Sequence, residues 1–553
     1  MMNEAIMMSE VIIMNEAAKK QGMGLYVHIP FCLSRCHYCS FASSAGLGRN
    51  WQERYKKGLL QEWQLYRQRW GNAGGYTGPG ASAALAEDEN QGRPQDWARD
   101  RSQDWARNWS QDWARSWDTI YFGGGTPTYL EEDILAEILA GLPVIPAKAQ
   151  MKAQEGAGPT TGEKTKASQG AAKAMPARPG AVAEGQPGAA VVCQPGAAVV
   201  CQPGAAVVCQ PGVAPREFTV EANPGTSSEG KLALLQKAGC NRLSMGAQSF
   251  DDQYLAWLGR GHRAADFRQA WEMARQAGFR NMSLDLIYGL PGQTLDHWRR
   301  TLEQALAFAP EHISLYQLNI EEETVLARRA AAGEACLADE ETCRRQYLLT
   351  HEVLTAAGFN HYEISNYALP GKESRHNSLY WRNGYYLGLG AGAAGYLPAG
   401  AGAGTGAGNS KGGEARAAAG EGAGAGAGSA TDLILGAGIG TVRAQSGRGL
   451  RYTNEADLAN YLSAVEQGRL PLAEKEAITP SLGRQEELML AFRLQQGVEP
   501  EAFRQRWGLD LWQAYGPLLE KHLAAGWLQE ERGRLQPTIE GWLAYNYWVQ
   551  DYF

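Results

Sequence analysis

The stretch HIPFCLSRCHYCSF, residues 28–41, places Cys32, Cys36 and Cys39 within eight positions, directly after the predicted strand GLYVHIP at 24–30. A structural zinc site takes four ligands, and no second C-x2-C or H-x3-H pair lies nearby. A four-iron cluster on three thiolates keeps one iron free of protein, which leaves a coordination site for a substrate or cofactor. The spacing therefore leaves a zinc site, and a cluster held by four thiolates, one ligand short, and it is compatible with a cluster that has one open iron.

The composition is that of an acidic chain with reduced thiols. The 553 residues carry a net charge of −7, with a pI near 5.8, and this excludes the basic surface of a protein that wraps DNA. The nine cysteines are an odd count, and the N-terminal extension 1–23 has no export cleavage site. No segment offers eighteen consecutive apolar residues. We expect a cytoplasmic protein with no nucleic-acid partner and no transmembrane segment; peripheral membrane contact stays open.

Three low-complexity insertions interrupt the globular sequence, at 72–117, 146–215 and 397–431. The first contains QDWAR three times, and the second contains QPGAAVVC three times. The regular spacing of its cysteines follows from duplication of that unit, so we expect no metal there. The cysteines of this array are Cys193, Cys201 and Cys209.

Short β-rich runs alternate with amphipathic helical patterns along the rest of the chain. This order is typical of an α/β fold with a parallel sheet, and about six units predict a partial (β/α)6 barrel. Because the carboxyl ends of parallel strands meet at one edge, the residues that follow them should form one site. The predicted strands are 24–30, 119–125, 217–224, 242–250, 281–291 and 312–321, and the predicted helices are 51–70, 131–142, 227–238, 264–278, 295–308 and 338–358.

Chemically useful residues follow the predicted strands. GGGTPT at 123–128 is a glycine-rich turn whose backbone can approach a ligand closely. Glu221 offers a carboxylate to ribose hydroxyls or a cationic group, while Gln248, Arg260 and Asp285 add donors and acceptors. Each residue alone would be taken as a structural hydrogen-bonding group. Their joint placement predicts contacts with a cofactor.

The cysteine motif, with an aromatic residue before its last cysteine and a strand ending in HIP before its first, resembles that of the radical S-adenosylmethionine (SAM) family. In this family the three cysteines hold a [4Fe–4S] cluster, and the open iron binds the amino and carboxylate groups of SAM. An electron donor reduces the cluster, which then cleaves SAM to a 5′-deoxyadenosyl radical. The resemblance implies Cys32, Cys36 and Cys39 as the metal ligands.

Within that family the chain is similar to the relatives of oxygen-independent coproporphyrinogen III oxidase. The motifs YVHIPFC, GGGTPT, EANPG, GAQSF, LGRGH, LDLIYGLPGQT and HNSLYW stand in the order of this subgroup and span nearly the whole chain outside the insertions. By this resemblance the residues that contact SAM are Tyr26, Gly124, Gly125, Thr126, Glu221, Gln248, Arg260 and Asp285.

The subgroup implies two alternative functions, a heme chaperone that passes heme to acceptor proteins such as respiratory enzymes, and the oxidase, which decarboxylates porphyrinogen propionates. Oxidases carry a further cysteine two residues after the third and a longer N-terminal arm, whereas this chain continues from Cys39 to Ser40 and Phe41. These departures favour the chaperone over a coproporphyrinogen dehydrogenase, and the sequence leaves enzymatic activity itself open.

The motif HNSLYW at 376–381 matches the HNxxYW motif of the chaperone group. It implies heme binding, with His376 as the candidate iron ligand and Tyr380 and Trp381 as flat surface for the macrocycle. Without the resemblance, a hydrogen-bonded structural histidine would be the preferred interpretation. Another family position, often a histidine, is Ala394 here, which cannot ligate iron.

The domain organisation follows from these motifs. We expect a radical SAM core at 24–366, a connecting region with HNSLYW at 367–483, and a mostly helical, winged-helix-like domain at 484–553. That last shape also suggests a nucleic-acid-binding regulator. Acidic residues outnumber basic ones in 484–553, however, which disfavours contact with phosphates.

Overall fold

The computed structural model describes residues 22–71, 117–144, 214–334, 337–398 and 449–553. The repeats of QDWAR and QPGAAVVC, with Cys193, Cys201 and Cys209, lie outside these residues, as do nearly all of the N-terminal extension and the Gly/Ala-rich insertion.

Six parallel strands form the centre of the fold, each close to its predicted range. β1 pairs with β4 from Gly24 opposite Thr119 to Ile29 opposite Gly124, and the remaining strands follow in chain order. Successive side chains of β1 alternate between the two faces: Leu25 and Val27 are fully buried against the helices, so Tyr26 points to the inside. The strands are β1 (Gly24–Ile29), β4 (Thr119–Gly124), β5 (Glu217–Ala222), β6 (Arg242–Gln248), β7 (Met282–Tyr288) and β8 (His312–Gln317).

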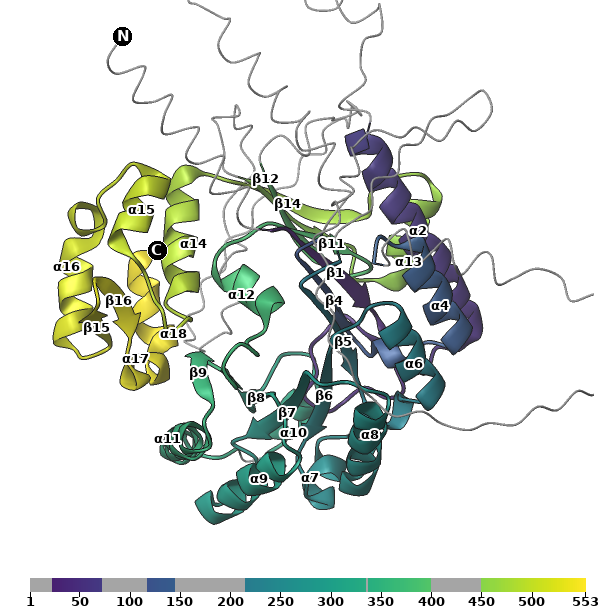
Figure 1. The fold of residues 1–553 in the computed structure, drawn as a ribbon, viewed down its shortest axis with the longest axis horizontal. Coiled ribbons are helices and arrows are strands. Elements are labelled where there is room, and N and C mark those ends of the chain that lie inside the picture. Colours follow the sequence, from purple (N-terminus) through teal and green to yellow (C-terminus); the bar gives the residue numbers. More distant parts are fainter. Residues whose placement is uncertain (1–21, 72–116, 145–213, 335–336, 399–448) are drawn as a thin grey trace, which may run out of the picture. The chain divides into compact units, whose positions relative to one another are not determined.

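Each predicted helix follows one of these strands in the chain, and the helices cover one face of the sheet (Figure 1). In α8, Phe267, Ala270, Trp271 and Ala274 recur at helical spacing and are buried in the main core. The prediction of alternating strands and helices is confirmed. The helices are α2 (Arg49–Gly71), α4 (Glu132–Gly141), α6 (Glu229–Lys237), α8 (Ala264–Gln276), α9 (Leu295–Ala307) and α11 (Glu340–Ala356).

The sheet is larger than the six predicted strands, and it is open. Among the described residues, twelve strands are hydrogen-bonded in one sheet, with β14 and β9 at its two ends. β11 pairs with β1 in parallel, and the other added strands pair antiparallel. The sequence did not predict these six strands, which are β9 (Asn360–Glu363), β10 (Asn366–Ala368), β11 (Tyr386–Leu389), β12 (Ala394–Pro398), β13 (Gly449–Asn454) and β14 (Leu472–Ile478).

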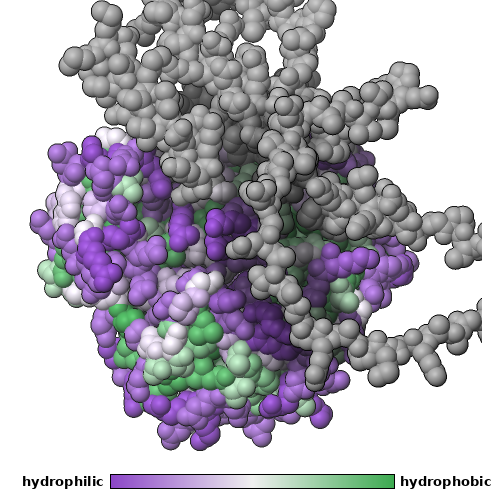
Figure 2. All heavy atoms as spheres, in the orientation of Figure 1, coloured by the Kyte–Doolittle hydropathy of each residue, from purple (hydrophilic) through white to green (hydrophobic). Residues whose placement is uncertain are grey.

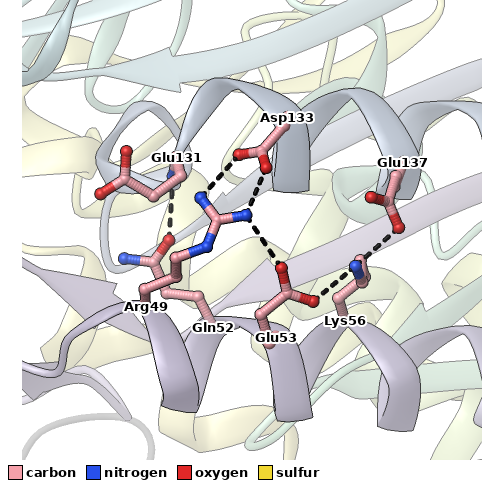
Figure 3. Close-up of polar contacts among 7 residues, drawn as sticks. All are labelled: Arg49, Gln52, Glu53, Lys56, Glu131, Asp133 and Glu137. Atoms are coloured by element: carbon pink, nitrogen blue, oxygen red, sulfur yellow. Dashed lines mark hydrogen bonds and ion pairs between the residues drawn. The ribbon is translucent and has the colours of Figure 1, made fainter.

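A polar network joins α2, which follows the cysteine loop, to α4, which follows the glycine turn (Figure 3). Lys56 donates to Glu53 and Glu137 at 2.6 Å each, and Arg49 pairs with Asp133. The Gln52 side-chain oxygen accepts from the backbone of Glu131 at 2.9 Å. Exposed pairs such as Arg49–Asp133 contribute little to stability individually, whereas Lys56 is buried, and together these contacts link the two helices.

The C-terminal residues form a small helical domain with its own core, built around Leu488, Phe492 and Trp548. Backbone hydrogen bonds join it to the sheet edge, from Ile364 to Arg493 and from Gln495 to Tyr362, both 3.0 Å. Its elements are α14 (Pro480–Ala491), α15 (Pro500–Trp507), α16 (Leu511–Ala524), the hairpin β15 (Leu528–Glu531) and β16 (Arg534–Pro537), α17 (Ile539–Leu543) and α18 (Tyr545–Trp548).

Candidate functional site

A hollow of about 390 Å³ opens at the carboxyl ends of the parallel strands. Its lining brings together residues from the cysteine loop and from the ends of β4, β5, β6 and β7, which are far apart in the sequence. The three predicted metal ligands and all predicted SAM contacts except Tyr26 border it, namely Cys32, Cys36, Cys39, Gly124, Gly125, Thr126, Glu221, Gln248, Arg260 and Asp285.

The cysteine loop leaves the sheet at Pro30 and is closed at its base by two short strands, β2 (Phe31–Cys32) and β3 (Ser44–Ala45). The backbone of Ser44 donates to the Pro30 carbonyl at 2.7 Å. This closure brings both ends of the loop back to the end of β1. The three thiols are thereby presented at the edge where the other strands also end.

The tip of the loop is held by two segments that the sequence did not predict as helices, α7 (Asp252–Trp257) and α10 (Val325–Ala331). His37 donates its backbone N–H to the Leu258 carbonyl at 2.9 Å and accepts from Leu326 at 2.7 Å. Its ring Nδ1 lies 2.7 Å from the Trp257 carbonyl oxygen. His37 therefore shapes the loop.

A chain of hydrogen bonds links two of the cysteines through residues of three other segments. Arg260 donates to Cys36 Sγ at 3.4 Å and to Asn223 Oδ1 at 2.5 Å. Asn223 donates to Thr126 Oγ1 at 2.7 Å, and the Thr126 hydroxyl donates to Cys32 Sγ at 3.7 Å. Donors aimed at sulfur favour thiolates, and so they suit cysteines that ligate a metal.

The arrangement of the thiols suits a cluster and does not suit a single ion. Among the residues that the structure describes, no three His, Cys, Asp or Glu side chains are grouped as ligands of one metal ion. The three thiols instead border a shared hollow, as a four-iron cluster requires. Burial raises the pKa of the Cys32 and Cys39 thiols, so metal binding would have to compensate for ionising them.

The glycine turn after β4 packs closely against β1 and the start of the cysteine loop. Gly124 has φ +101°, a conformation that favours glycine. A Cβ on Gly125 would come within 2.8 Å of the carbonyl oxygens of Ile29 and Phe31. The backbone of this turn can therefore approach both the cysteine loop and a ligand in the hollow.

Glu221 is the carboxylate at the end of β5. Burial raises its pKa to about 7, although a hydrogen bond from Tyr121 at 2.6 Å opposes this rise. Tyr26 lies beside Tyr121 on the neighbouring strand, with ring centroids 6.2 Å apart. Tyr26 therefore belongs to the interior beneath the hollow rather than to its lining, and its hydroxyl lies 2.9 Å from His28 Nδ1.

Asp285 and Gln248 complete the polar lining. The Ser244 hydroxyl donates to Asp285 at 3.2 Å, and the Ser283 hydroxyl donates at 3.3 Å. Gln248 has φ +64° at a break in the register between β6 and β7. Bulges and left-handed non-glycine residues of this kind are common where a strand aims a side chain at a ligand.

His376 lies away from the hollow, on α12 (Arg375–Trp381), and it is fully buried. Its Nδ1 lies 2.8 Å from Thr119 Oγ1, and its Nε2 lies 2.7 Å from the Tyr380 hydroxyl. Burial lowers its pKa to about 3. Both ring nitrogens are thus engaged, which fits a hydrogen-bonded structural histidine better than an available iron ligand.

The aromatic residues of the HNSLYW motif also have partners. The Tyr380 ring packs edge-on against the Tyr386 ring at 4.5 Å. The guanidinium of Arg493 lies 4.4 Å above the Trp381 ring and joins this motif to the C-terminal domain. Arg493 therefore covers one face of the Trp381 ring.

Sequence reasoning missed three residues that organise the site, Asn223, Tyr121 and His28. Asn223 stands within EANPG beside the predicted Glu221, and Tyr121 follows the strand alternation, so its inward direction was predictable. His28 lies in the HIP segment before the cysteines, and no sequence pattern assigns it a role. Its Nε2 lies 2.8 Å from the Ala42 carbonyl oxygen, which connects β1 to the far side of the cysteine loop.

Comparison with known proteins agrees with this geometry. Residues 205–305 match the profile of the Radical SAM superfamily, and residues 484–544 match that of the HemN C-terminal domain. The solved structure of coproporphyrinogen III oxidase (HemN) from Escherichia coli superimposes with a TM-score of 0.58, covering 96% of this chain and 90% of that one. At 16% identity, this match confirms the radical SAM fold and carries no argument about activity.

The sequence relatives identify the family more closely than the shared fold does. The heme chaperone HemW of Bacillus subtilis is 31% identical over 330 residues, covering 60% of this chain and 74% of the relative. HemW of Lactococcus lactis is 30% identical over 325 residues, covering 59% and 72%. The chain therefore belongs to the HemW heme chaperone family of radical SAM proteins.

Proposed function

We propose that this chain binds heme and delivers it to acceptor proteins, as the names of its relatives describe for them. The observation that carries the proposal is the single hollow in which three thiols meet the glycine turn and the polar strand ends.

In this proposal Cys32, Cys36 and Cys39 hold a [4Fe–4S] cluster, and the rest of the hollow receives SAM. Bound together, the two groups supply one-electron chemistry at the sulfonium, and an electron donor would have to supply that electron. The chain's own residues would position them: Arg260 holds Cys36 beside Asn223, and the glycine turn borders the hollow.

Apolar side chains border the mouth of the hollow and support binding of a porphyrin. Phe41 is 64% exposed and Leu33 is 53% exposed on the cysteine loop, while Tyr316 lies near the end of β8 and is 46% exposed. A hydrophobic area is also visible in the lower part of Figure 2, where Figure 1 places β7, β8 and α10. Exposed apolar groups of this kind commonly mark ligand or partner surfaces.

The heme contact at HNSLYW stays a prediction, and it would require a change in the hydrogen bonds of His376. His376 can ligate iron only if it gives up Thr119 or Tyr380. Hemin titration of the full chain, followed by the Soret band, tests this contact with His376→Ala. Phe41→Ala tests whether the mouth of the hollow contributes to hemin binding. Tyr547→Ala is the matched control, because Tyr547 is an aromatic residue in the C-terminal domain that is 74% exposed.

We expect saturable hemin binding by the wild type. His376→Ala should lose affinity for hemin or change its spectrum, and Tyr547→Ala should match the wild type. Absence of saturable binding in the wild type would refute the chaperone function. Wild-type behaviour of His376→Ala would place the iron ligand elsewhere.

The alternative function is the oxidase. Because Cys39 is followed by Ser40 and Phe41 rather than by a further cysteine, we expect little or no protoporphyrinogen IX from coproporphyrinogen III with SAM and a reductant. Efficient turnover would favour the oxidase. For the nucleic-acid alternative, no shift in a low-salt gel is expected, given the acidic C-terminal domain.

None of the helices in the described part of the chain combines the length and the apolar character needed to cross a bilayer. The cytoplasmic location remains a prediction.

A further inference from the structure

We propose that Tyr121 is a positioning residue that connects the carboxylate of Glu221, in the hollow, to the HNSLYW helix α12 through His376. The two regions are 155 residues apart in sequence, from 221 to 376, and nothing in their motifs suggests a connection. The inference deepens the proposed function, on which it rests for its link to heme.

The Tyr121 side chain contacts both regions. It extends from β4 into the interior, where its hydroxyl donates to Glu221 Oε1 at 2.6 Å. Its ring stacks on the imidazole of His376, with centroids 5.1 Å apart and an interplanar angle of 27°. A movement of either neighbour therefore changes the position of the donor that Glu221 uses.

His376 provides a fixed surface for this ring. A neutral imidazole has one N–H and one lone pair in its plane, and the Thr119 and Tyr380 hydroxyls lie at those two nitrogens at 2.8 and 2.7 Å. The backbone of α12 is held as well, because Glu217 accepts from the N–H groups of Arg375 and His376 at 2.8 and 3.0 Å. The orientation of the ring is thus determined from three directions.

The charged and titratable groups around Glu221 make the Tyr121 hydroxyl important. Asp285 opposes ionisation of Glu221, while Arg242 favours it from the adjacent strand. In the described part of the chain, no hydrogen bond or ion pair joins Arg242 to Glu221, so Tyr121 is the side-chain donor in contact with the carboxylate. The titratable groups that interact with Glu221 from the surrounding elements are Tyr26, Tyr121, Arg242, Asp285, Tyr316 and Tyr380.

Two consequences follow for a ligand in the hollow. A donor to the ionised carboxylate keeps Glu221 available as an acceptor for hydroxyl or ammonium groups. If heme draws His376 away from Thr119 or Tyr380, Tyr121 loses its stacking partner, and the affinity for SAM changes. By thermodynamic linkage, SAM then changes the affinity for heme by the same factor.

Tyr121→Phe separates this role from simple packing, because it keeps the ring and removes only the hydroxyl. Tyr347→Phe is the matched control: Tyr347 is also buried, and its hydroxyl donates to the Ile364 carbonyl at 2.9 Å, outside the lining of the hollow. The readout is the dissociation constant of SAM, measured by anaerobic equilibrium dialysis of cluster-loaded full-length protein between pH 6 and 9.

We expect about tenfold weaker SAM binding at pH 7 in Tyr121→Phe, since a hydrogen bond to a charged group is lost. Removal of the donor also raises the pKa of Glu221 further, so the midpoint of the pH dependence should move upward, while Tyr347→Phe should match the wild type. An unchanged affinity and midpoint in Tyr121→Phe would overturn the proposal.

A second variant tests the connection to α12. Thr119→Val removes one partner of His376 and leaves both Tyr121 and Glu221 in place. It should weaken SAM binding in the same direction with the circular dichroism spectrum unchanged, and wild-type SAM binding would limit the role to Tyr121 and overturn the connection. Hemin titration is independent of the SAM-binding measurements on these two variants. A wild type that does not bind hemin refutes the chaperone function. The shift in the midpoint of the pH dependence in Tyr121→Phe still decides the positioning role.

Discussion

The imidazole of His28 occupies the space into which a side chain at Gly124 would project. A Cβ on Gly124 would come within 2.6 Å of the His28 Cε1 and Nε2 atoms. His28 cannot easily turn aside, because the Tyr26 hydroxyl and the Ala42 carbonyl lie 2.9 and 2.8 Å from its two ring nitrogens. The glycine turn and the cysteine loop are therefore held against each other through one histidine.

This contact predicts the effect of Gly124→Ala. Both the positive φ and the clash oppose alanine, so the free energy of unfolding should fall by about 2 kcal/mol more than in a variant with the positive φ alone. Gly371→Ala is that control, since Gly371 has φ +77° with nothing within 4 Å of an added Cβ. Urea denaturation measures the free energy of unfolding of both variants. Equal decreases would show that the His28 contact does not oppose a Cβ at Gly124.

The cysteine assignment predicts the iron content. Anaerobic reconstitution should give about four irons per chain and a broad visible absorption band, and alanine at Cys32, Cys36 or Cys39 should abolish both. Cys240→Ala and Cys343→Ala are the matched controls, because both residues are buried free cysteines that do not line the hollow. Full iron occupancy in all three loop variants would contradict the assignment.

Arg260→Lys should keep the charge but lose the fork that joins Cys36 to Asn223. We expect the affinity for SAM to fall by about tenfold, since two charge-assisted hydrogen bonds from a planar group are lost. The cluster's EPR signal in the presence of SAM should also change. Arg263→Lys, on an exposed residue nearby, should leave both unchanged. Equal SAM affinities and equal EPR signals in the two variants would mean that the Arg260 contacts do not contribute to SAM binding.

Glu62 predicts a pH dependence of stability. Its carboxylate is fully buried between Gly390, Asn454 and Tyr461, and burial raises its pKa to about 7. The folded state therefore binds a proton more tightly than the unfolded state, so this contribution to stability is complete below about pH 4 and is lost as pH rises through 7. The loss amounts to about 3 kcal/mol.

Glu62→Gln removes this titration, so the difference in unfolding free energy between variant and wild type should shift in favour of the variant from pH 6 to pH 8.5. Denaturation at several pH values measures it. Glu466→Gln, at an exposed carboxylate paired with Arg54, should show no such trend. Parallel pH profiles for wild type and Glu62→Gln would contradict the burial argument.

Much of the fold was predictable because its pattern is local. Alternation along β1 and the helical spacing of Phe267, Ala270 and Trp271 are properties of neighbouring residues, and they located the strands and helices. The pairing of β12 with β13 was not predictable, since these strands meet from either side of residues 399–448. Sheet registers between distant segments depend on the whole core.

The sequence by itself determined the order of strands and helices and the spacing of Cys32, Cys36 and Cys39, since both depend on adjacent residues. Only the tertiary structure decided that Arg260 meets Cys36, that burial brings Glu221 to a pKa of about 7, and that both nitrogens of His376 are occupied. The physical reason is that hydrogen-bond partners and loss of solvent come from segments distant in sequence. A residue's type states what it can bind, and its surroundings determine whether it is free to do so.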